Sequence, residues 1–222
     1  GYVPFLVLSG IVSALVILKP ATTIVVILMA TALTVYFVSG ANLKYIFGTL
    51  LLGALILTAV VYITPYRWQR IQSFLNQEAN PQAGGYHLNQ AKIAIGSGGL
   101  TGVGYGESTT KIGYLPEPIG DSIFAVIGEE LGFIGSMGLI TVFFVFILKI
   151  FLLAKKSRDH FARFLLVGFG TLIALQVFIN IGAISGLLPL TGVPLPFISY
   201  GGTALATFLT ISGVIANISK YN

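Results

Sequence analysis

The sequence predicts an all-α integral membrane protein, a polytopic bundle of about six transmembrane helices with one long, structured extracytoplasmic loop. Of its 222 residues, 55% are hydrophobic and only 9% are charged, whereas soluble domains carry about 25% charged residues. The apolar runs are continuous and lack the alternation of lipid-facing strands, which favours helices over a barrel. We expect residues 1–222 to form a single membrane domain.

Six apolar segments approach the roughly 20 residues that a bilayer-spanning helix needs. In chain order they are residues 2–18, 21–38, 45–64, 131–154, 161–184 and 204–219. Lys19-Pro20 closes the first segment, and Pro65 follows the third, because proline cannot continue a helix. Prolines and glycines between residues 187 and 204 exclude a regular helix there. The chain starts at Gly1, directly before a span, with neither an initiator methionine nor a signal peptide, as expected of a fragment.

Basic residues orient these segments. Four of them cluster between the fourth and fifth segments: Lys155, Lys156, Arg158 and Arg163. The positive-inside rule places that short loop in the cytoplasm, and by parity residues 65–130 then face outward. Lys19 would face outward too and is an exception. The net charge of +5 is therefore a topology signal, and no nucleic-acid partner is expected.

The stretch 65–130 is polar and rich in glycine. It holds six of the seven acidic residues of the chain: Glu78, Glu107, Glu117, Asp121, Glu129 and Glu130. Long loops are usually functional or disordered. Disordered segments lack aromatic residues, whereas this loop carries Trp68, Phe74, Tyr86, Tyr105, Tyr114 and Phe124. We therefore expect an ordered loop that carries the chemistry.

Asp121 is the sharpest candidate for chemistry in this loop. The preceding segment PEPIG, residues 116–120, should hold it at the start of a helix. An aspartate there either caps free backbone N–H groups or acts as a catalytic carboxylate, and both readings stay open. Glu129 and Glu130 follow about two turns later in an apolar helix, where carboxylates are usually paired or functional.

Four cations of the loop are candidates for binding an anionic group such as a diphosphate. They are Arg67, Arg70, Lys92 and Lys111. The alternative is that some of them extend toward lipid headgroups.

Other polar features favour structural roles. The glycine-rich run 96–106 matches neither the dinucleotide-binding nor the Walker spacing, so tight turns or close backbone packing is the expected role. His87 is alone in the loop, which argues against a histidine metal site. Gln176 and Asn180, four residues apart on one helix, are expected to join helices by hydrogen bonds.

Four blocks together resemble the SEDS family, the FtsW/RodA/SpoVE membrane proteins. They are residues 66–74 (YRWQRIQSF), 85–106 (GYHLNQAKIAIGSGGLTGVGYG), 108–132 (STTKIGYLPEPIGDSIFAVIGEELG) and 186–202 (GLLPLTGVPLPFISYGG). The resemblance covers essentially the whole chain, which would be the C-terminal part of the family's fold. Two departures stand out: the loop before the second span reads Lys19-Pro20-Ala21 instead of Gln-Pro-Asp, and Gly120 replaces a threonine.

The resemblance implies an inverting peptidoglycan glycosyltransferase of the bacterial cytoplasmic (inner) membrane, which polymerises lipid II into glycan strands on the extracytoplasmic side. Asp121 falls where the family has its essential loop aspartate, with general base as the implied role. The resemblance also implies a substrate-binding set: Lys111, Glu117, Arg70 and Lys92. Cations or a divalent metal, Mg²⁺ or Mn²⁺, would offset the diphosphate charge, and no organic cofactor is expected.

The implied partners are lipid II, the nascent glycan strand, a class B penicillin-binding protein, and other membrane proteins of the divisome or elongasome. STTKIGYLPE looks more like the division branch and TGVPLPF more like RodA, and division is favoured. Two other functions stay open, a flippase or transporter of the lipid-linked precursor and a non-catalytic scaffold for the penicillin-binding protein. Spans almost free of charge argue against a transport path along the midplane.

Overall fold

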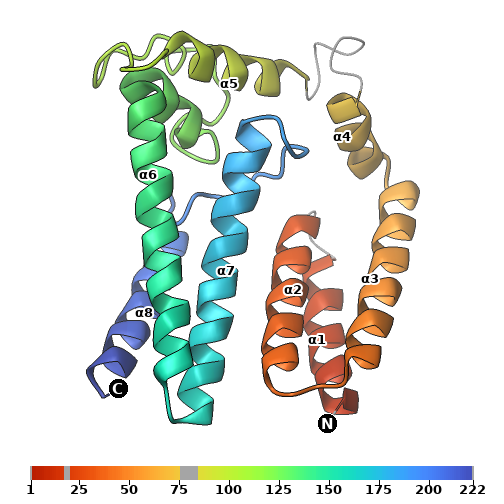
Figure 1. The fold of residues 1–222 in the computed structure, drawn as a ribbon. Helices are drawn as coiled ribbons and strands as arrows, with labels where there is room; N and C mark the ends of the chain where they lie inside the picture. Colours follow the sequence, from red (N-terminus) through yellow and green to blue (C-terminus); the bar gives the residue numbers. More distant parts are fainter. Residues whose placement is uncertain (1, 18–20, 76–84, 222) are drawn as a thin grey trace. The chain divides into compact units, whose positions relative to one another are not determined.

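The computed structural model describes residues 2–17, 21–75 and 85–221. Within them the chain forms eight helices and no strand (Figure 1): α1 (Tyr2–Ile17), α2 (Thr22–Val38), α3 (Leu43–Ile63), α4 (Pro65–Leu75), α5 (Gly85–Ser97), α6 (Ile123–Lys156), α7 (His160–Ile184) and α8 (Gly202–Lys220). The predicted all-α membrane fold is confirmed. Lys19, Pro20 and Glu78 lie outside the described residues.

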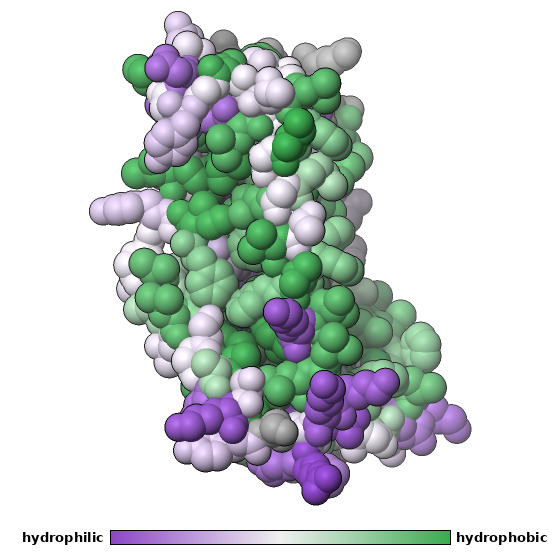
Figure 2. All heavy atoms as spheres, turned by 60° about the vertical axis from the view of Figure 1, so that its left-hand side comes forward, coloured by the Kyte–Doolittle hydropathy of each residue, from purple (hydrophilic) through white to green (hydrophobic). Residues whose placement is uncertain are grey.

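Each of the six apolar segments is a helix. Within the described chain, four of these helices are long and apolar enough to cross a membrane, namely α3, α6, α7 and α8. The helices α1 and α2 are also apolar, but their 16 and 17 residues are shorter. The count of six spans therefore stays a prediction. Apolar side chains cover most of the surface in Figure 2, as a lipid environment permits.

The described residues group into two compact units. The first comprises Gly1–Val60, Ile147–Leu175 and Gly213–Asn222. In it, aromatic contacts hold α1 to its neighbours: the Tyr2 ring stacks on Tyr45 of α3 at 4.5 Å, and Phe5 stacks on Tyr36 of α2 at 4.5 Å. The Tyr2 hydroxyl also lies 2.9 Å from the hydroxyl of Thr49. The single membrane domain predicted from the sequence remains a prediction.

The second unit comprises Val61–Phe146 and Gln176–Ser212 and carries every residue of the candidate site. It contains α4, α5, the first part of α6 and the end of α7. The polar stretch after α3 thus includes two helices, and α5 lies across the first turns of α6 (Figure 1).

A break in α6 at Gly132 organises this unit. Gly132 has φ 64° and ψ −162°, which are not helical values. The carbonyls of Glu129 and Glu130 lie just before the break, so they lose their helical hydrogen-bond donors. The Glu129 carbonyl accepts a hydrogen bond from the Val103 N–H at 3.0 Å. The Glu130 carbonyl accepts one from the Gly104 N–H at 3.1 Å.

The N–H groups beyond the break find partners in the same glycine-rich turn. The Phe133 N–H donates to the Gly99 carbonyl at 2.9 Å. The Ile134 N–H donates to the Leu100 carbonyl at 3.1 Å. The turn therefore replaces the two helical hydrogen bonds that the break removes. The sequence places the start of the fourth span at residue 131, beside this break, whereas α6 itself begins at Ile123.

Glycine is required where this turn approaches α6. A Cβ atom on Gly98 would lie 2.0 Å from the Gly128 carbonyl oxygen, and one on Gly102 would lie 2.1 Å from the Glu130 oxygen. Gly102 also has φ +83°, a value that favours glycine. The run 96–106 thus serves tight turns and close backbone packing, as its sequence predicts.

The two adjacent glutamates of α6 bind the segment after this turn. Glu129, only 2% exposed, accepts hydrogen bonds from the Ser108 hydroxyl at 2.6 Å, from the Thr109 N–H at 3.1 Å and from the Thr110 hydroxyl. Glu130 forms a 2.6 Å salt bridge with Lys111. Both carboxylates are paired, so the cost of placing them at the start of an apolar helix is offset.

We predict that Gly98→Ala destabilises the protein by about 1–3 kcal/mol, because the new methyl group has no room beside the α6 backbone. The matched control is Gly96→Ala, where nothing lies within 4 Å of the added Cβ. A helical Gly→Ala change of that kind is neutral or stabilises by about 0.5–1 kcal/mol. Thermal unfolding of the purified protein in detergent measures both, and equal unfolding temperatures would contradict this close packing.

Candidate active site

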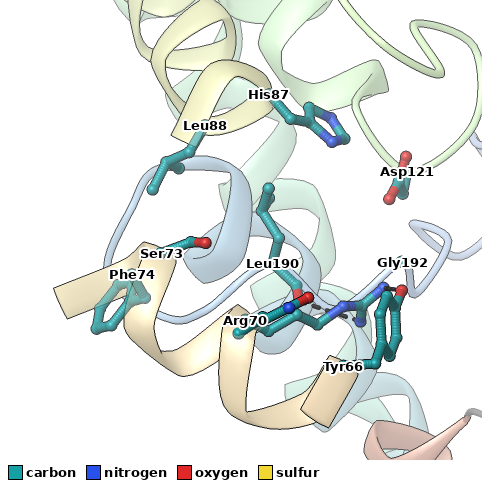
Figure 3. Close-up of a pocket in the computed structure, with 10 residues that line it drawn as sticks. Tyr66, Arg70, Ser73, Phe74, His87, Leu88, Asp121, Leu190 and Gly192 are labelled. Atoms are coloured by element: carbon teal, nitrogen blue, oxygen red, sulfur yellow. Dashed lines mark hydrogen bonds between the residues drawn. The ribbon is translucent and has the colours of Figure 1, made fainter. Parts of the chain in front are cut away.

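The second unit contains a pocket of about 340 Å³ (Figure 3). Its lining comes from α4, from α5, from the turn before α6 and from the segment after α7: Tyr66, Gln69, Arg70, Ser73, Phe74, His87, Leu88, Asp121, Leu190 and Gly192. Two residues of the predicted site, Asp121 and Arg70, therefore lie in one pocket although they are far apart in the chain. The pocket is the natural candidate for binding and chemistry.

A tight turn carries Asp121 into this pocket. The Glu117 carbonyl accepts hydrogen bonds from the N–H groups of Gly120 at 3.0 Å and Ser122 at 3.3 Å. Glu117 itself has φ 48°, an uncommon value for a residue other than glycine. The helix α6 begins at Ile123, two positions after Asp121.

Asn180 of α7 secures this turn from the other side. Its amide nitrogen donates to the main-chain carbonyl of Asp121 at 2.9 Å and to that of Val193 at 2.7 Å. Gln176 donates to the Pro194 carbonyl at 3.2 Å. The sequence suggested that Gln176 and Asn180 join two helices. These bonds instead join α7 to irregular segments, whose backbone carbonyls have no helical partner.

The Asp121 carboxylate is held in place but only partly satisfied. Its Oδ1 is buried and has no hydrogen-bond partner among the described residues. No N–H of α6 in the described chain donates to it, so the capping role left open by the sequence is not seen. Burial raises the pKa of Asp121, and the nearby Glu117 carboxylate adds to the rise, while His87, a bond from its own N–H and Arg70 oppose it. A carboxylate with a raised pKa is a stronger base.

Arg70 provides the positive charge of the pocket. Its guanidinium lies over the Tyr66 ring, 4.7 Å from the centroid, and donates to the Tyr66 hydroxyl and, at 3.4 Å, to the Leu190 carbonyl. Tyr66 and Arg70 are four residues apart on α4 and therefore share one face. Figure 3 shows both on the opposite side of the pocket from His87. An arginine fixed in this way suits recognition of a phosphate group.

His87 is the pocket residue that sequence reasoning missed. Its Nε2 lies 2.6 Å from the hydroxyl of Ser122, the residue next to Asp121 in the chain. Burial lowers the pKa of His87, although the carboxylates of Asp121 and Glu117 oppose that effect. The signal in the sequence was its place in the polar stretch 65–130, because a histidine can bind other groups there even where it does not bind a metal.

The other predicted binding residues lie outside the pocket lining. Lys111 Nζ lies 2.6 Å from both the Glu130 carboxylate and the Gly106 carbonyl. The Lys92 side chain lies against Gly186, where an added Cβ would come within 2.3 Å of its Cε. Glu117 is near enough to raise the pKa of Asp121. The binding roles of Lys111, Lys92 and Glu117 remain predictions.

The described side chains do not by themselves form a metal-binding site. Across residues 2–17, 21–75 and 85–221, no three His, Cys, Asp or Glu side chains come together in a way that would hold an ion. Mg²⁺ is commonly bound by one or two carboxylates together with substrate phosphates. Asp121 is the one carboxylate among the described residues that line the pocket, so substrate phosphates would have to supply most of the ligands of such an ion.

The sequence matches known proteins along its whole length. The family model for cell cycle proteins of the FtsW/RodA/SpoVE type matches residues 1–222. Stage V sporulation protein E of Bacillus subtilis (strain 168) is 38% identical over 222 residues, which cover 100% of this chain and 61% of the relative. The probable peptidoglycan glycosyltransferase FtsW of Coxiella burnetii (strain RSA 493 / Nine Mile phase I) is 42% identical, with 99% of this chain and 60% of the relative covered.

Two solved structures share the fold. A chain from work on the structural coordination of polymerization and crosslinking by a peptidoglycan synthase complex aligns with a TM-score of 0.78 at 25% identity, over 99% of this chain and 62% of that one. A mutant of the rod shape determining protein RodA of Thermus thermophilus aligns with a TM-score of 0.65 at 25% identity, over 96% and 55%. The chain thus spans about three fifths of the length of the curated relatives.

We predict that Asp121→Asn raises the unfolding temperature at neutral pH. A carboxyl group whose pKa is raised by folding stabilises the protein when it is protonated, and that stability is lost as the pH rises through the raised pKa. The neutral amide does not carry this cost, so the gain should shrink as the pH is lowered below that pKa. Thermal unfolding at several pH values measures it.

The control for this measurement is Asp159→Asn. Asp159 is exposed and caps α7 by accepting from the N–H groups of Phe161 at 3.2 Å and Ala162 at 3.1 Å. Asparagine caps helices about as well as aspartate does, so this variant should unfold near the wild-type temperature. A fall in unfolding temperature for Asp121→Asn at neutral pH would contradict a destabilising burial of its charge.

Proposed function

Because the chain belongs to the FtsW/RodA/SpoVE family of cell cycle proteins, we propose that it carries the active site of a peptidoglycan glycosyltransferase. The reaction would join lipid II units into glycan strands at the outer face of the bacterial cytoplasmic membrane. The observation that carries the proposal is the pocket in which an incompletely hydrogen-bonded carboxylate, Asp121, lies with the guanidinium of Arg70. Several relatives are named as probable peptidoglycan glycosyltransferases, which supports it.

In the proposed reaction Asp121 is the general base. Its carboxylate takes the proton from a sugar hydroxyl of the acceptor as that oxygen attacks the anomeric carbon of the donor. The bond from the anomeric carbon to the diphosphate oxygen breaks, and undecaprenyl diphosphate leaves with the bonding electrons. A single displacement inverts the configuration. The raised pKa of Asp121 suits a base, and a positioned base supplies about 10²–10⁴-fold.

Arg70 would offset the negative charge that develops on the leaving diphosphate. It projects from α4 into the same pocket as Asp121, and preorganised charge of this kind stabilises a transition state. Lys92 and Lys111 lie outside the lining, so in our proposal they contact more distant parts of the substrate. A divalent cation that arrives with the diphosphate, Mg²⁺ or Mn²⁺, belongs to the proposal as well, and the diphosphate would supply most of its ligands.

We further propose that the protein works with a class B penicillin-binding protein, which would crosslink the strands. One structural neighbour comes from a complex that combines polymerization and crosslinking, and this supports the pairing. A role in division, favoured by the resemblance of the segment STTKIGYLPE to the division branch, belongs to the proposal. The basic cluster in and beside the short loop between α6 and α7 supports an extracytoplasmic pocket through the positive-inside rule.

The test compares glycan synthesis by wild type and Asp121→Asn. The natural protein that carries this chain is purified with a class B penicillin-binding protein and given labelled lipid II and a divalent cation. We expect a ladder of glycan strands from wild type and a loss of about 10²–10⁴-fold in the variant. Glu107→Gln, which changes an exposed carboxylate outside the pocket, is the matched control and should keep the ladder.

The remaining outcomes separate the rival functions. Equal ladders from wild type and Asp121→Asn would remove Asp121 as the base and direct attention to Glu117. A well-folded wild-type protein that makes no ladder would contradict the polymerase. Transport of labelled precursor between the leaflets of a vesicle would then indicate a flippase. Unchanged binding to the penicillin-binding protein without transport would indicate a scaffold.

A further inference from the structure

The turn that presents Asp121 has few regular hydrogen bonds of its own. Between Pro116 and Ser122 the main chain makes two bonds within the turn, both to the Glu117 carbonyl. Glu117 adopts an uncommon conformation with positive φ, and such conformations persist where surrounding contacts hold them in place. The position of the Asp121 carboxylate therefore depends on groups that bind the turn from outside: the Tyr200 N–H, which donates to the Ile119 carbonyl at 2.8 Å, and side chains of α5 and α7.

One such contact runs through Ser122, which is fully buried at 0% exposure. Its hydroxyl donates to the Pro116 carbonyl at 2.8 Å and so closes the turn on itself. The hydroxyl lies 2.6 Å from Nε2 of His87 in α5. A serine hydroxyl has a single proton, and the carbonyl takes it. His87 must therefore be the donor, with its proton on Nε2.

We propose that His87 is a positioning residue for Asp121: its Nε2–H binds the Ser122 hydroxyl and thereby fixes the turn that holds the carboxylate in the pocket. The chain of bonds runs from α5 through two side chains to the Pro116 carbonyl. In the neutral ring Nδ1 is then the unprotonated nitrogen. His87 itself lines the pocket with Asp121 (Figure 3). A role in glycan synthesis rests on the proposed function, whereas the bond and the tautomer do not.

Charged groups lie around the ring of His87. They are Asp121 and Glu117 from the turn and Arg70 from α4, while Leu190 and Gly192 contribute no charge. The two carboxylates raise the pKa of His87 against the larger lowering that burial causes. His87 is therefore the neutral donor that its bond to Ser122 requires.

The test uses variants that separate the hydrogen bond from the charge. His87→Gln keeps an N–H donor near the position of Nε2 but cannot be protonated. His87→Ala removes the donor, and Ser122→Ala removes the hydroxyl that receives it. His160→Gln makes the same change at an exposed histidine of α7 and serves as the matched control.

We expect His87→Ala and Ser122→Ala each to lower kcat for glycan synthesis by about tenfold, as a small displacement of a catalytic group does. The double variant should lose little more than the worse single variant, because both changes break one chain of bonds. His87→Gln should keep most of the wild-type rate, because its side-chain N–H can still bind the Ser122 hydroxyl. Rescue by glutamine where alanine fails distinguishes a positioning hydrogen bond from general packing of the ring.

Histidine ¹⁵N chemical shifts in lipid give a readout that needs no activity. We expect the chemical shifts of a His87 ring that is protonated at Nε2. In Ser122→Ala the preference for this tautomer should weaken, because the hydroxyl that accepts the Nε2–H is gone. The pKa of His87 should fall in Asp121→Asn, since the carboxylate raises it. A spectrum of His87→Gln, from which the signal is missing, identifies the His87 signal. A ring protonated at Nδ1 alone would overturn the inference.

Kinetic outcomes can overturn it as well. Wild-type rates in His87→Ala and Ser122→Ala would do so, as would losses that multiply in the double variant. A wild-type protein that makes no glycan would contradict the proposed function alone. In that case the tautomer of His87, and its change in Ser122→Ala, still decide whether the bond exists.

Discussion

The exchange of backbone hydrogen bonds at the break in α6 is the contact on which the second unit depends. An apolar helix that breaks at Gly132 leaves two carbonyls and two N–H groups without helical partners, and such groups are costly away from water. The glycine-rich turn 99–104 supplies all four partners. It can do so because Gly98 and Gly102 let two backbones meet at distances that no side chain would permit.

This contact sets the path of residues 108–121. Once the turn is bound to α6, residues 108–111 lie against Glu129 and Glu130, and the segment that ends at Asp121 must close within a few residues. Two carboxylates of this region therefore have different environments. Glu129 is surrounded by hydroxyl and N–H donors, whereas Oδ1 of Asp121 has no partner in the described chain. Glu129 therefore holds residues 108–110 against α6, whereas Oδ1 of Asp121 can still accept a proton.

The pocket then depends on contacts that reach the Asp121 turn from three segments of the chain. The Tyr200 N–H donates to the Ile119 carbonyl at 2.8 Å. Asn180 binds its backbone from α7, and His87 binds Ser122 from α5. None of these contacts involves the Asp121 side chain, so the turn is held while Oδ1 stays without a hydrogen-bond partner in the described chain. Arg70 reaches the same pocket from α4. A carboxylate and a guanidinium thus line one pocket, and no salt bridge joins them among the described residues.

The sequence alone determined the all-α membrane class and the six apolar helices to within a few residues at most ends, and it predicted Asp121 and Arg70 as members of one site. The class and the helices come from composition and from continuous apolar runs, and the site prediction comes from blocks that resemble a known family. Only the tertiary structure decided that α6 begins before residue 131, that His87 faces the pocket and that Lys111 pairs with Glu130. The reason is physical: a break in a helix, a tautomer and a choice of ion pair depend on partners distant in the chain, which no local pattern contains.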